Sequence, residues 1–299
     1  MNLPPHNARR PRLLIVGCGD IGRRVLSLVH PRWRVLALSS SPDKAAALRQ
    51  LGALPLLGNL DQPETLGRLG ALADWVLHLA PPPSRGTVDT RTRALVAALA
   101  RGGRVRRLVY ASTSGVYGDA GGALFDETRP LRPATDRARR RVDAEARVRW
   151  FGRSSGVVVT VLRIPGIYAA SRAGGDPRDR LRRGTPSLQA ADDVFTNHIH
   201  ADDLARICVL ALLRGKPQRA LHASDDTELR MGDYFDLTAE LSGLPPPPRV
   251  SRAQAAEQLS PLQLSFMSES RRLDNSRLKR DLRLKLRYPT VREGLASGR

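Results

Sequence analysis

A glycine-rich turn near the amino terminus constrains the fold more than any other feature of the sequence. The apolar run LLIV (13–16) is followed directly by Gly17-Cys18-Gly19-Asp20-Ile21-Gly22, which predicts a strand, a tight turn and a helix in succession. This G-x-G-x-x-G spacing, in this context, is typical of a backbone that binds a dinucleotide pyrophosphate. Gly17 permits the turn, Gly19 lets a phosphate approach the backbone, and Gly22 lets helix and strand pack closely. The first helical residues, Asp20 and Ile21, bring free N–H groups and the positive end of the helix dipole.

The first half of the chain has the pattern of a parallel α/β sheet. Apolar runs recur without strict alternation, as expected for strands buried on both faces. They are LLIV (13–16), RVLAL (34–38), ALPLL (53–57), WVLHLA (75–80), RRLVYAS (106–112) and VVVTVLRI (157–164). Helix-like segments separate them, and one offers Ser41 as N-cap, Pro42 at the first helical position and Asp43 in the first turn. We therefore predict a doubly wound parallel sheet, a Rossmann fold, forming an NAD(P)-binding domain over residues 1–164.

After residue 164 the alternation of apolar strands and helix-like segments ends. Residues 171–187 are rich in Gly, Pro and Arg, and shorter helices are expected after 201–203 and at 231–242 and 252–258. These segments are too interrupted to form a second independent core. We expect residues 165–299 to form a smaller C-terminal substrate-binding lobe, with interleaved returning elements. The lobe should cover the carboxyl edge of the sheet, where α/β proteins bind ligands.

Composition excludes several classes of protein. The net charge of +20 suggests a polyanionic partner, but all but four of the 49 basic residues are arginine, spread evenly along the chain. General composition therefore explains the charge better than a nucleic-acid surface does. Cys18 and Cys208 alone cannot form a disulfide framework, and no apolar stretch approaches the roughly eighteen residues of a membrane span. We expect a cytoplasmic protein without a nucleic-acid or membrane partner, as a monomer or homodimer.

The end of the second predicted strand bears on the choice of cofactor. An Asp or Glu there would accept a hydrogen bond from the ribose 2′-hydroxyl of NAD. The sequence instead places Ser39 and Ser40 at the strand end and Lys44 shortly after them, with Arg23-Arg24 nearby. These groups suit the 2′-phosphate of NADP, which is favoured over NAD. Asp43 keeps NAD open as the alternative, although it suits the first turn of a helix better.

Further along the chain, several short strings resemble one known family. They are HLA (78–80), STSGVYG (112–118), LRIPGIY (162–168), NHIHADDL (197–204), LDN (273–275) and YPT (288–290). In this order and spacing the chain resembles the short-chain dehydrogenase/reductase superfamily, in its extended form, the NAD-dependent epimerase/dehydratase family. The resemblance covers nearly the whole chain. It implies further cofactor contacts from Asn59, Leu60, Leu79, Ala80 and Pro165.

Members of this family use a Ser/Thr, a Tyr and a Lys for catalysis. The resemblance places the Ser/Thr at Thr113, four residues before Tyr117, with Ser112 beside it on the substrate side. The family's Tyr-x-x-x-Lys motif falls on Arg137 and Arg141, so that neither expected residue is present. The departure resembles an atypical subgroup in which the glycine-rich turn is kept and the catalytic residues are eroded.

The two arginines can replace only part of this chemistry. Arg141 carries a cation and donors that suit ribose hydroxyls, so it remains a candidate for both catalysis and cofactor binding. Arg137 cannot transfer a proton at working pH, but it suits an acidic substrate or a phosphate. We therefore expect Tyr117 to transfer the proton, with Tyr168, His200 or water as alternatives. Asn197 is expected to face the substrate.

Two further clusters of polar residues lie in the second half of the chain. His198 and His200 beside Asp202 do not predict a metal site, because such a segment in the family is a loop entering a helix. Arginines of the 171–187 loop suit a cationic lid over a sugar nucleotide or acidic metabolite: Arg172, Arg178, Arg180, Arg182 and Arg183. The sequence thus favours an NAD(P)-dependent oxidoreductase or epimerase/dehydratase-like enzyme acting on a sugar-nucleotide-like or other small carbonyl or hydroxyl substrate. The alternative is a non-catalytic NADP(H) sensor or carrier.

Overall fold

A seven-stranded sheet with helices on both faces is the centre of the computed structural model, which describes residues 10–297. The strand order is β12-β7-β5-β4-β1-β2-β3. The neighbours β1/β2, β2/β3, β1/β4 and β4/β5 all pair in parallel. The predicted doubly wound fold is therefore confirmed. The strands are β1 (Arg12–Val16), β2 (Arg34–Ser39), β3 (Leu54–Leu57), β4 (Trp75–His78), β5 (Arg107–Thr113), β7 (Val158–Ile164) and β12 (Arg219–His222).

The chain divides into two compact units whose segments alternate along the sequence. The first unit comprises the chain up to Ala111, Asp143–Val161 and Cys208–Arg219. The second comprises Ser112–Val142, Leu162–Ile207 and the chain from Ala220 onward. The sequence predicts a domain boundary at residue 164, and this boundary stays a prediction.

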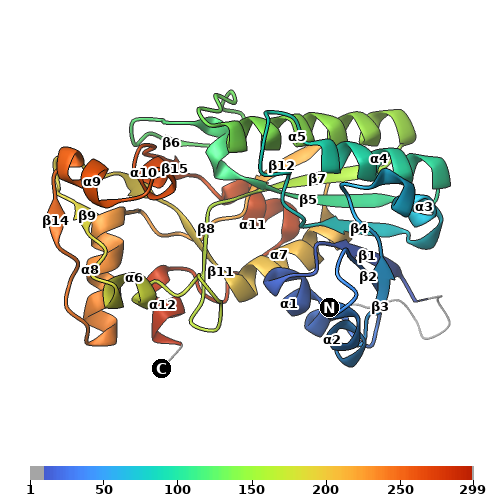
Figure 1. Ribbon diagram of the computed structural model, residues 1–299, viewed down its shortest axis with the longest axis horizontal. Helices are drawn as coiled ribbons and strands as arrows, with labels where there is room; N and C mark the ends of the chain where they lie inside the picture. The colour runs from blue at the N-terminus through green and yellow to red at the C-terminus, as the bar shows by residue number, and fades with distance from the viewer. Residues whose placement is uncertain (1–9, 298–299) are drawn as a thin grey trace. The chain divides into compact units, whose positions relative to one another are not determined.

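In the first unit, helices flank the strands β1 to β5, with α1 and α2 on one face and α3 and α4 on the other (Figure 1). Buried strand residues such as Leu14 and Ile15 are completely shielded from solvent, as a sheet covered on both faces requires. Gly70 of α3 approaches α4 so closely that a Cβ there would lie 2.4 Å from the Leu99 carbonyl oxygen. The elements are α1 (Asp20–Val29), α2 (Lys44–Gln50), η1 (Pro63–Leu66), α3 (Leu69–Leu72) and α4 (Thr90–Gly102).

Helix α2 begins later than the sequence predicts. Its first residue is Lys44 and its N-cap residue is Asp43, rather than Ser41. The reason is local, because the Ser39 hydroxyl donates to the Ser41 carbonyl oxygen at 3.1 Å and accepts from the Ser41 N–H at 3.2 Å. These two bonds close a turn directly after β2, and the helix starts only beyond it.

The second unit contains short strand pairs and helices around an aromatic core. Tyr168, Tyr234 and Phe235 pack together in this core. The carboxylate of Asp203, fully buried, accepts the backbone N–H groups of Arg287 and Tyr288 at 2.8–2.9 Å and so holds the C-terminal segment. The strand pairs are β6/β15 (Leu124–Phe125, Arg272–Leu273), β8/β11 (Gly166–Tyr168, His198–His200), β9/β14 (Ser187–Leu188, Arg249–Val250) and β10/β13 (Phe195–Thr196, Leu229–Arg230).

The remaining helices differ in how closely they match the sequence prediction. α8 and α9 have the predicted bounds, and the helix expected after residues 201–203 starts at Ala201. Within residues 10–297, no helix is both long enough and apolar enough to cross a membrane. The helices are η2 (Ser114–Tyr117), α5 (Asp136–Ser155), α6 (Arg178–Arg182), α7 (Ala201–Arg214), α8 (Met231–Ser242), α9 (Arg252–Gln258), α10 (Pro261–Phe266), α11 (Ser276–Leu282) and α12 (Val291–Ala296).

Candidate functional site

The glycine-rich turn of the first unit has the geometry that its sequence predicts. Gly17 has a positive φ of 88°, and a Cβ there would lie 2.5 Å from the backbone nitrogen of Ala80. Gly19 is the N-cap residue of α1, no side chain caps this helix end, and a Cβ at Gly19 would meet no atom within 4 Å. The amino end of α1 therefore faces open space, as a bound phosphate requires.

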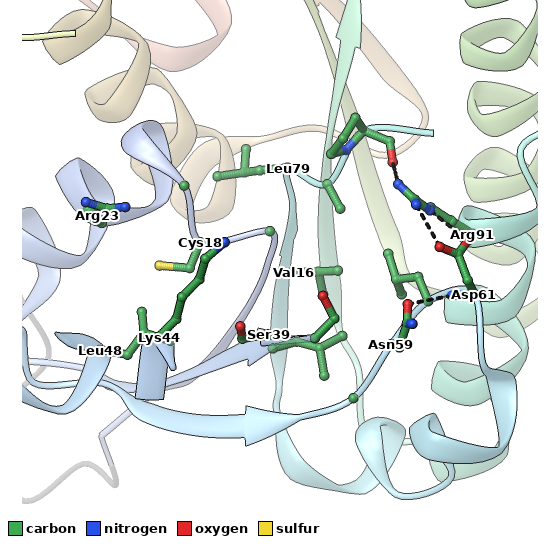
Figure 2. Close-up of a pocket in the computed structure, with 18 residues that line it drawn as sticks. Val16, Cys18, Arg23, Ser39, Lys44, Leu48, Asn59, Asp61, Leu79 and Arg91 are labelled. Carbon is green, nitrogen blue, oxygen red and sulfur yellow. Dashed lines mark hydrogen bonds and ion pairs between the residues drawn. The ribbon is translucent and has the colours of Figure 1, made fainter. Parts of the chain in front are cut away.

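This turn forms one wall of a cavity of about 460 Å³, here called the turn pocket (Figure 2). Most of the cofactor residues predicted from the sequence line it: Gly17, Gly19, Ser39, Ser40, Lys44, Asn59, Leu60, Leu79 and Ala80. Asp20, Ile21 and Gly22 instead form the first turn of α1 behind this wall. The Asp20 carboxylate bonds to Arg24 Nε at 3.2 Å along the same helix.

Charge is distributed unevenly around the turn pocket. Arg23 of α1 and Lys44 of α2 lie on the side of Cys18 and Ser39 (Figure 2). Asp61 and Arg91, on the opposite side, form an ion pair with each other. Burial raises the pKa of the Cys18 thiol to about 11, so this side chain stays neutral at physiological pH. The pocket thus offers an uncapped helix end and two cations, which fit a phosphorylated dinucleotide.

The second unit has a cavity of similar volume, here called the arginine pocket. Arginine and aromatic side chains dominate its wall: Arg137, Arg180, Arg183 and Arg271 with Tyr168, Phe195, Tyr234, Phe235 and Phe266. Three further predicted residues, Thr113, Pro165 and Asn197, also line it. Asp176 and Glu269 are the acids of the wall, and they bond to Arg178 and Arg271 respectively.

Two arginines of this pocket are held in fixed positions. Arg180 donates from Nη2 to the Pro186 carbonyl oxygen at 2.6 Å and lies over the Phe235 ring at 4.5 Å. Burial lowers the pKa of Arg180 to about 10, which still leaves it charged near neutrality. Arg271 donates from Nη1 to the Gly118 carbonyl oxygen at 2.7 Å. Preorganised guanidinium groups of this kind suit an anionic ligand.

The two arginines at the family's Tyr and Lys positions have different surroundings. Arg137, in the first turn of α5, lines the arginine pocket with its guanidinium carbon 4.7 Å from the centre of the Phe266 ring. Desolvation on this side lowers the pKa of Arg137, and Glu269 partly offsets the effect. Arg141, one turn further along α5, is half-buried and does not belong to the wall of this pocket. Its expected contact with the cofactor stays a prediction.

Three predicted residues of the second unit differ in what they offer a substrate. Thr113, at the end of β5, accepts the Gly115 N–H at 3.3 Å and keeps its hydroxyl proton available for donation. Ser112 is 4% exposed and is not among the residues that line the pocket. Asn197 lines the pocket, but it donates to the Arg271 carbonyl oxygen and accepts the Leu273 N–H, both at 2.9 Å. Its amide therefore fastens two segments together.

Tyr117 is completely buried and is not part of the pocket wall. Its hydroxyl oxygen accepts from Arg163 Nη1 at 2.5 Å. His222 Nδ1 must donate to the carbonyl oxygen of Asp274, 2.9 Å away, so its Nε2 accepts the Tyr117 proton at 2.6 Å. The Tyr117 hydroxyl thus uses its hydrogen-bond donor on His222 and its acceptor on Arg163 inside the core. In this conformation it has no proton to offer a substrate.

The alternative proton donors are also engaged. The Tyr168 hydroxyl donates to the Thr290 carbonyl oxygen at 3.4 Å, and burial raises its pKa. His200 Nδ1 accepts the Asp202 N–H at 3.2 Å, outside the pocket wall. Among residues 10–297 no cluster of His, Cys, Asp or Glu could hold a metal ion.

His198 lines the arginine pocket, although sequence reasoning did not assign it to the site. Its ring stacks on Tyr234 with 3.9 Å between centres, and burial lowers its pKa to about 3, so it is neutral. The pairing of β11 with β8 places it beside Gly166. A histidine in a short buried strand gives no sequence signal that distinguishes a pocket wall from a core.

Comparison with known proteins identifies the family of this chain. The sequence model of the NAD dependent epimerase/dehydratase family matches residues 13–223, and the chain belongs to this family. The expected resemblance is therefore confirmed. The family is described as NAD dependent, and two structural neighbours are solved with NAD bound, whereas the match does not fix the choice between NADP and NAD in this chain.

Individual relatives cover most of the chain. A ketoreductase from Stigmatella aurantiaca, named for 4-hydroxy-2-methyl-3-oxo-4-farnesyl-3,4-dihydroquinoline-1-oxide, is 29% identical over 76% of this chain and 72% of its own. A functionally unknown conserved protein from Silicibacter pomeroyi superposes with a TM-score of 0.81 at 32% identity, over 96% of this chain and 97% of its own. UDP-glucose 4-epimerase from Thermotoga maritima, solved with UDP-glucose, superposes with a TM-score of 0.78 over the same shares. At 19% identity that last likeness shows the fold alone.

Proposed function

We propose that this protein is an NADP(H)-dependent oxidoreductase that interconverts a carbonyl and a hydroxyl group on a small anionic substrate. The observation that carries the proposal is the turn pocket, where the uncapped end of α1 at Gly19 faces open space beside two cations. The relative from Stigmatella aurantiaca, a ketoreductase by name, supports carbonyl reduction over epimerisation or dehydration. NADPH would supply the hydride when bound.

The preference for NADP rests on the end of β2. Ser39 and Ser40 stand where an acid would bind the NAD ribose, and Lys44 and Arg23 line the same side of the pocket. The Ser39 hydroxyl is occupied by Ser41, so we assign the 2′-phosphate to Ser40, Lys44 and Arg23. A carboxylate is absent from this side of the described pocket wall, and Asp61 on the other side is paired with Arg91.

The arginine pocket is the proposed substrate site. Arg137, Arg180 and Arg271 supply positive charge, and the aromatic wall supplies apolar surface for the body of a substrate. Thr113 donates a hydrogen bond from its hydroxyl to the substrate oxygen and so orients it, without giving up its proton. In reduction, hydride adds to the carbonyl carbon and the oxygen takes a proton. We assign this proton to water held at Thr113, because Tyr117, Tyr168 and His200 are already engaged.

Turnover tests this assignment. Purified protein should oxidise NADPH with a member of a panel of carbonyl compounds that includes carboxylates, phosphates and nucleotide sugars. Thr113→Ala should reduce kcat by about 10²-fold or more, because it removes the group that orients the reacting oxygen. The absence of NADPH oxidation and of isomerisation across the whole panel would overturn the proposal of an enzyme.

Arg137 favours a second candidate, a non-catalytic sensor or carrier of NADP(H). This side chain stacks on Phe266 at the position where the family has its proton-transferring Tyr. A sensor would bind NADPH and show no turnover. Turnover of the wild-type protein that Thr113→Ala abolishes would rule this candidate out.

A further inference from the structure

Arg91 closes the side of the turn pocket that faces α4 (Figure 2). Its Nε and Nη2 donate to the two carboxylate oxygens of Asp61 at 2.8 and 2.7 Å. Its Nη1 donates to the Pro81 carbonyl oxygen at 3.3 Å. One side chain of α4 therefore ties the segment that follows β3 to the segment that follows β4. A bidentate pair of this kind fixes orientation as well as distance.

Asp61 is in turn hydrogen-bonded to Asn59. The backbone N–H of Asp61 donates to Asn59 Oδ1 at 3.0 Å, and the backbone N–H of Asn59 donates to Thr65 Oγ1 at 2.9 Å. Because a backbone N–H can only donate, the side-chain atom facing Asp61 must be the amide oxygen. Asn59 lines the turn pocket, and its Oδ1 faces Asp61. Its NH₂ group is therefore the end of the amide that can face the pocket.

The position of Asn59 in the sheet indicates which part of a dinucleotide it would meet. In this fold the pyrophosphate lies at the end of β1 and the adenosine ribose at the end of β2. The strand order β4-β1-β2-β3 puts the end of β3 beyond the ribose position, on the adenosine side. Asn59 follows β3 by two residues.

We infer that Arg91 is a positioning residue for the cofactor. Through Asp61 it orients the Asn59 amide so that its NH₂ group donates to the adenosine half of the dinucleotide. The inference rests on the cofactor part of the proposed function and not on catalysis. The adenosine half is common to NADPH and NADH, so Arg91 strengthens the binding of both, unlike Lys44 and Arg23, which we assign to the 2′-phosphate.

A double-mutant cycle tests the inference, with dissociation constants for NADPH and NADH measured by isothermal titration calorimetry. Arg91→Met should weaken binding of both dinucleotides about tenfold, and Asn59→Ala should do the same. In the double variant the loss should not exceed that of Asn59→Ala alone, because Arg91 acts through Asn59. Arg91→Lys, which keeps the charge but not the bidentate pair, should recover part of the affinity.

Arg93→Met is the matched control, since Arg93 lies exposed on the same helix and outside the pocket wall. It should leave both dissociation constants unchanged. Three outcomes would overturn the inference while leaving the cofactor proposal intact. The first is a loss of affinity in the double variant equal to the product of the two single-variant losses. The others are a loss of affinity for NADPH alone and unchanged affinity of Arg91→Met for both dinucleotides. Failure of the wild-type protein to bind either dinucleotide would overturn both. If Arg91→Met does not fold, Arg91→Lys takes its place in the double-mutant cycle with Asn59→Ala, and the same dissociation constants are measured.

Discussion

Tyr117 donates its hydroxyl proton to His222 Nε2 at 2.6 Å inside the core of the second unit. Arg163 completes the arrangement by donating to the same hydroxyl oxygen. The sequence makes Tyr117 the first choice for proton transfer, whereas this contact gives it a structural role. The difference leads to a prediction that separates the two roles.

Tyr117→Phe should destabilise the fold and leave chemistry unchanged. The substitution keeps the ring and removes the bond that satisfies a buried imidazole and a buried guanidinium, at a cost of about 1–3 kcal/mol. Denaturant unfolding measures the loss, and kcat per folded molecule should stay within about twofold of wild type. If Tyr117 were the proton donor, kcat would instead fall by about 10²-fold or more.

The two buried histidines His222 and His198 should each contribute stability that is lost as the pH falls from about 6.5 toward 4. Burial lowers the pKa of His222 to about 4 and that of His198 to about 3, below the value of about 6.5 in the unfolded chain. At each of these two histidines the unfolded state binds more protons than the folded state in this window. Each histidine therefore makes the free energy of unfolding rise with pH by up to about 1.4 kcal/mol per pH unit.

His198→Phe tests one of these two contributions. It preserves an aromatic ring against Tyr234 and removes the titrating group, so the slope of unfolding free energy against pH should be smaller than in wild type. An equal slope in wild type and His198→Phe would show that His198 does not remain neutral in the folded state.

Substitutions at the two glycines of the turn should affect different properties: one should reduce stability and the other should abolish dinucleotide binding. Gly17→Ala should destabilise the protein, by about 1–3 kcal/mol, because φ is positive and the new Cβ would clash with the Ala80 backbone. Gly19→Asp should leave the melting temperature near that of wild type, since its Cβ meets no atom within 4 Å, and should abolish dinucleotide binding. Undiminished binding by Gly19→Asp would place the phosphates elsewhere.

Arg137 should contribute to substrate affinity. Once a substrate is found, Arg137→Gln should raise its KM by about tenfold or more, which corresponds to about 1.4 kcal/mol, through loss of a cation in the pocket wall. Arg139→Gln is the control, because Arg139 is exposed and pairs with Asp136 on the same helix. Equal KM values for the two variants would remove Arg137 from the substrate site.

Features of the sequence that are local or periodic predicted much of this structure. The apolar runs correspond to sheet strands, and the glycine spacing predicted a turn whose Gly17 and Gly19 have the expected geometry. Helix α2 was placed too early because the Ser39 hydroxyl closes a turn first. Of the two hydroxyl residues that the sequence places near the end of β5, Thr113 lines the arginine pocket and Ser112 does not, and their roles stay predictions.

The remaining differences arise from tertiary contacts. The short helix η2 (Ser114–Tyr117) carries Tyr117 into the core, while Thr113 at its start lines the arginine pocket. The Arg91–Asp61 pair joins residues thirty positions apart, and neither residue stands out in the sequence. Long-range pairs of this kind have no local signal, so only the folded structure reveals them.

We propose that the turn pocket binds NADP(H) in preference to NAD(H). The direct measurement is a fluorescence titration of the wild-type protein with NADPH and with NADH, repeated on Gly19→Asp. We predict that NADPH binds at least about tenfold more tightly than NADH, because Ser40, Lys44 and Arg23 meet the additional phosphate, and that Gly19→Asp binds neither. Equal affinity for the two dinucleotides, or binding of neither by the wild-type protein, would contradict the claim.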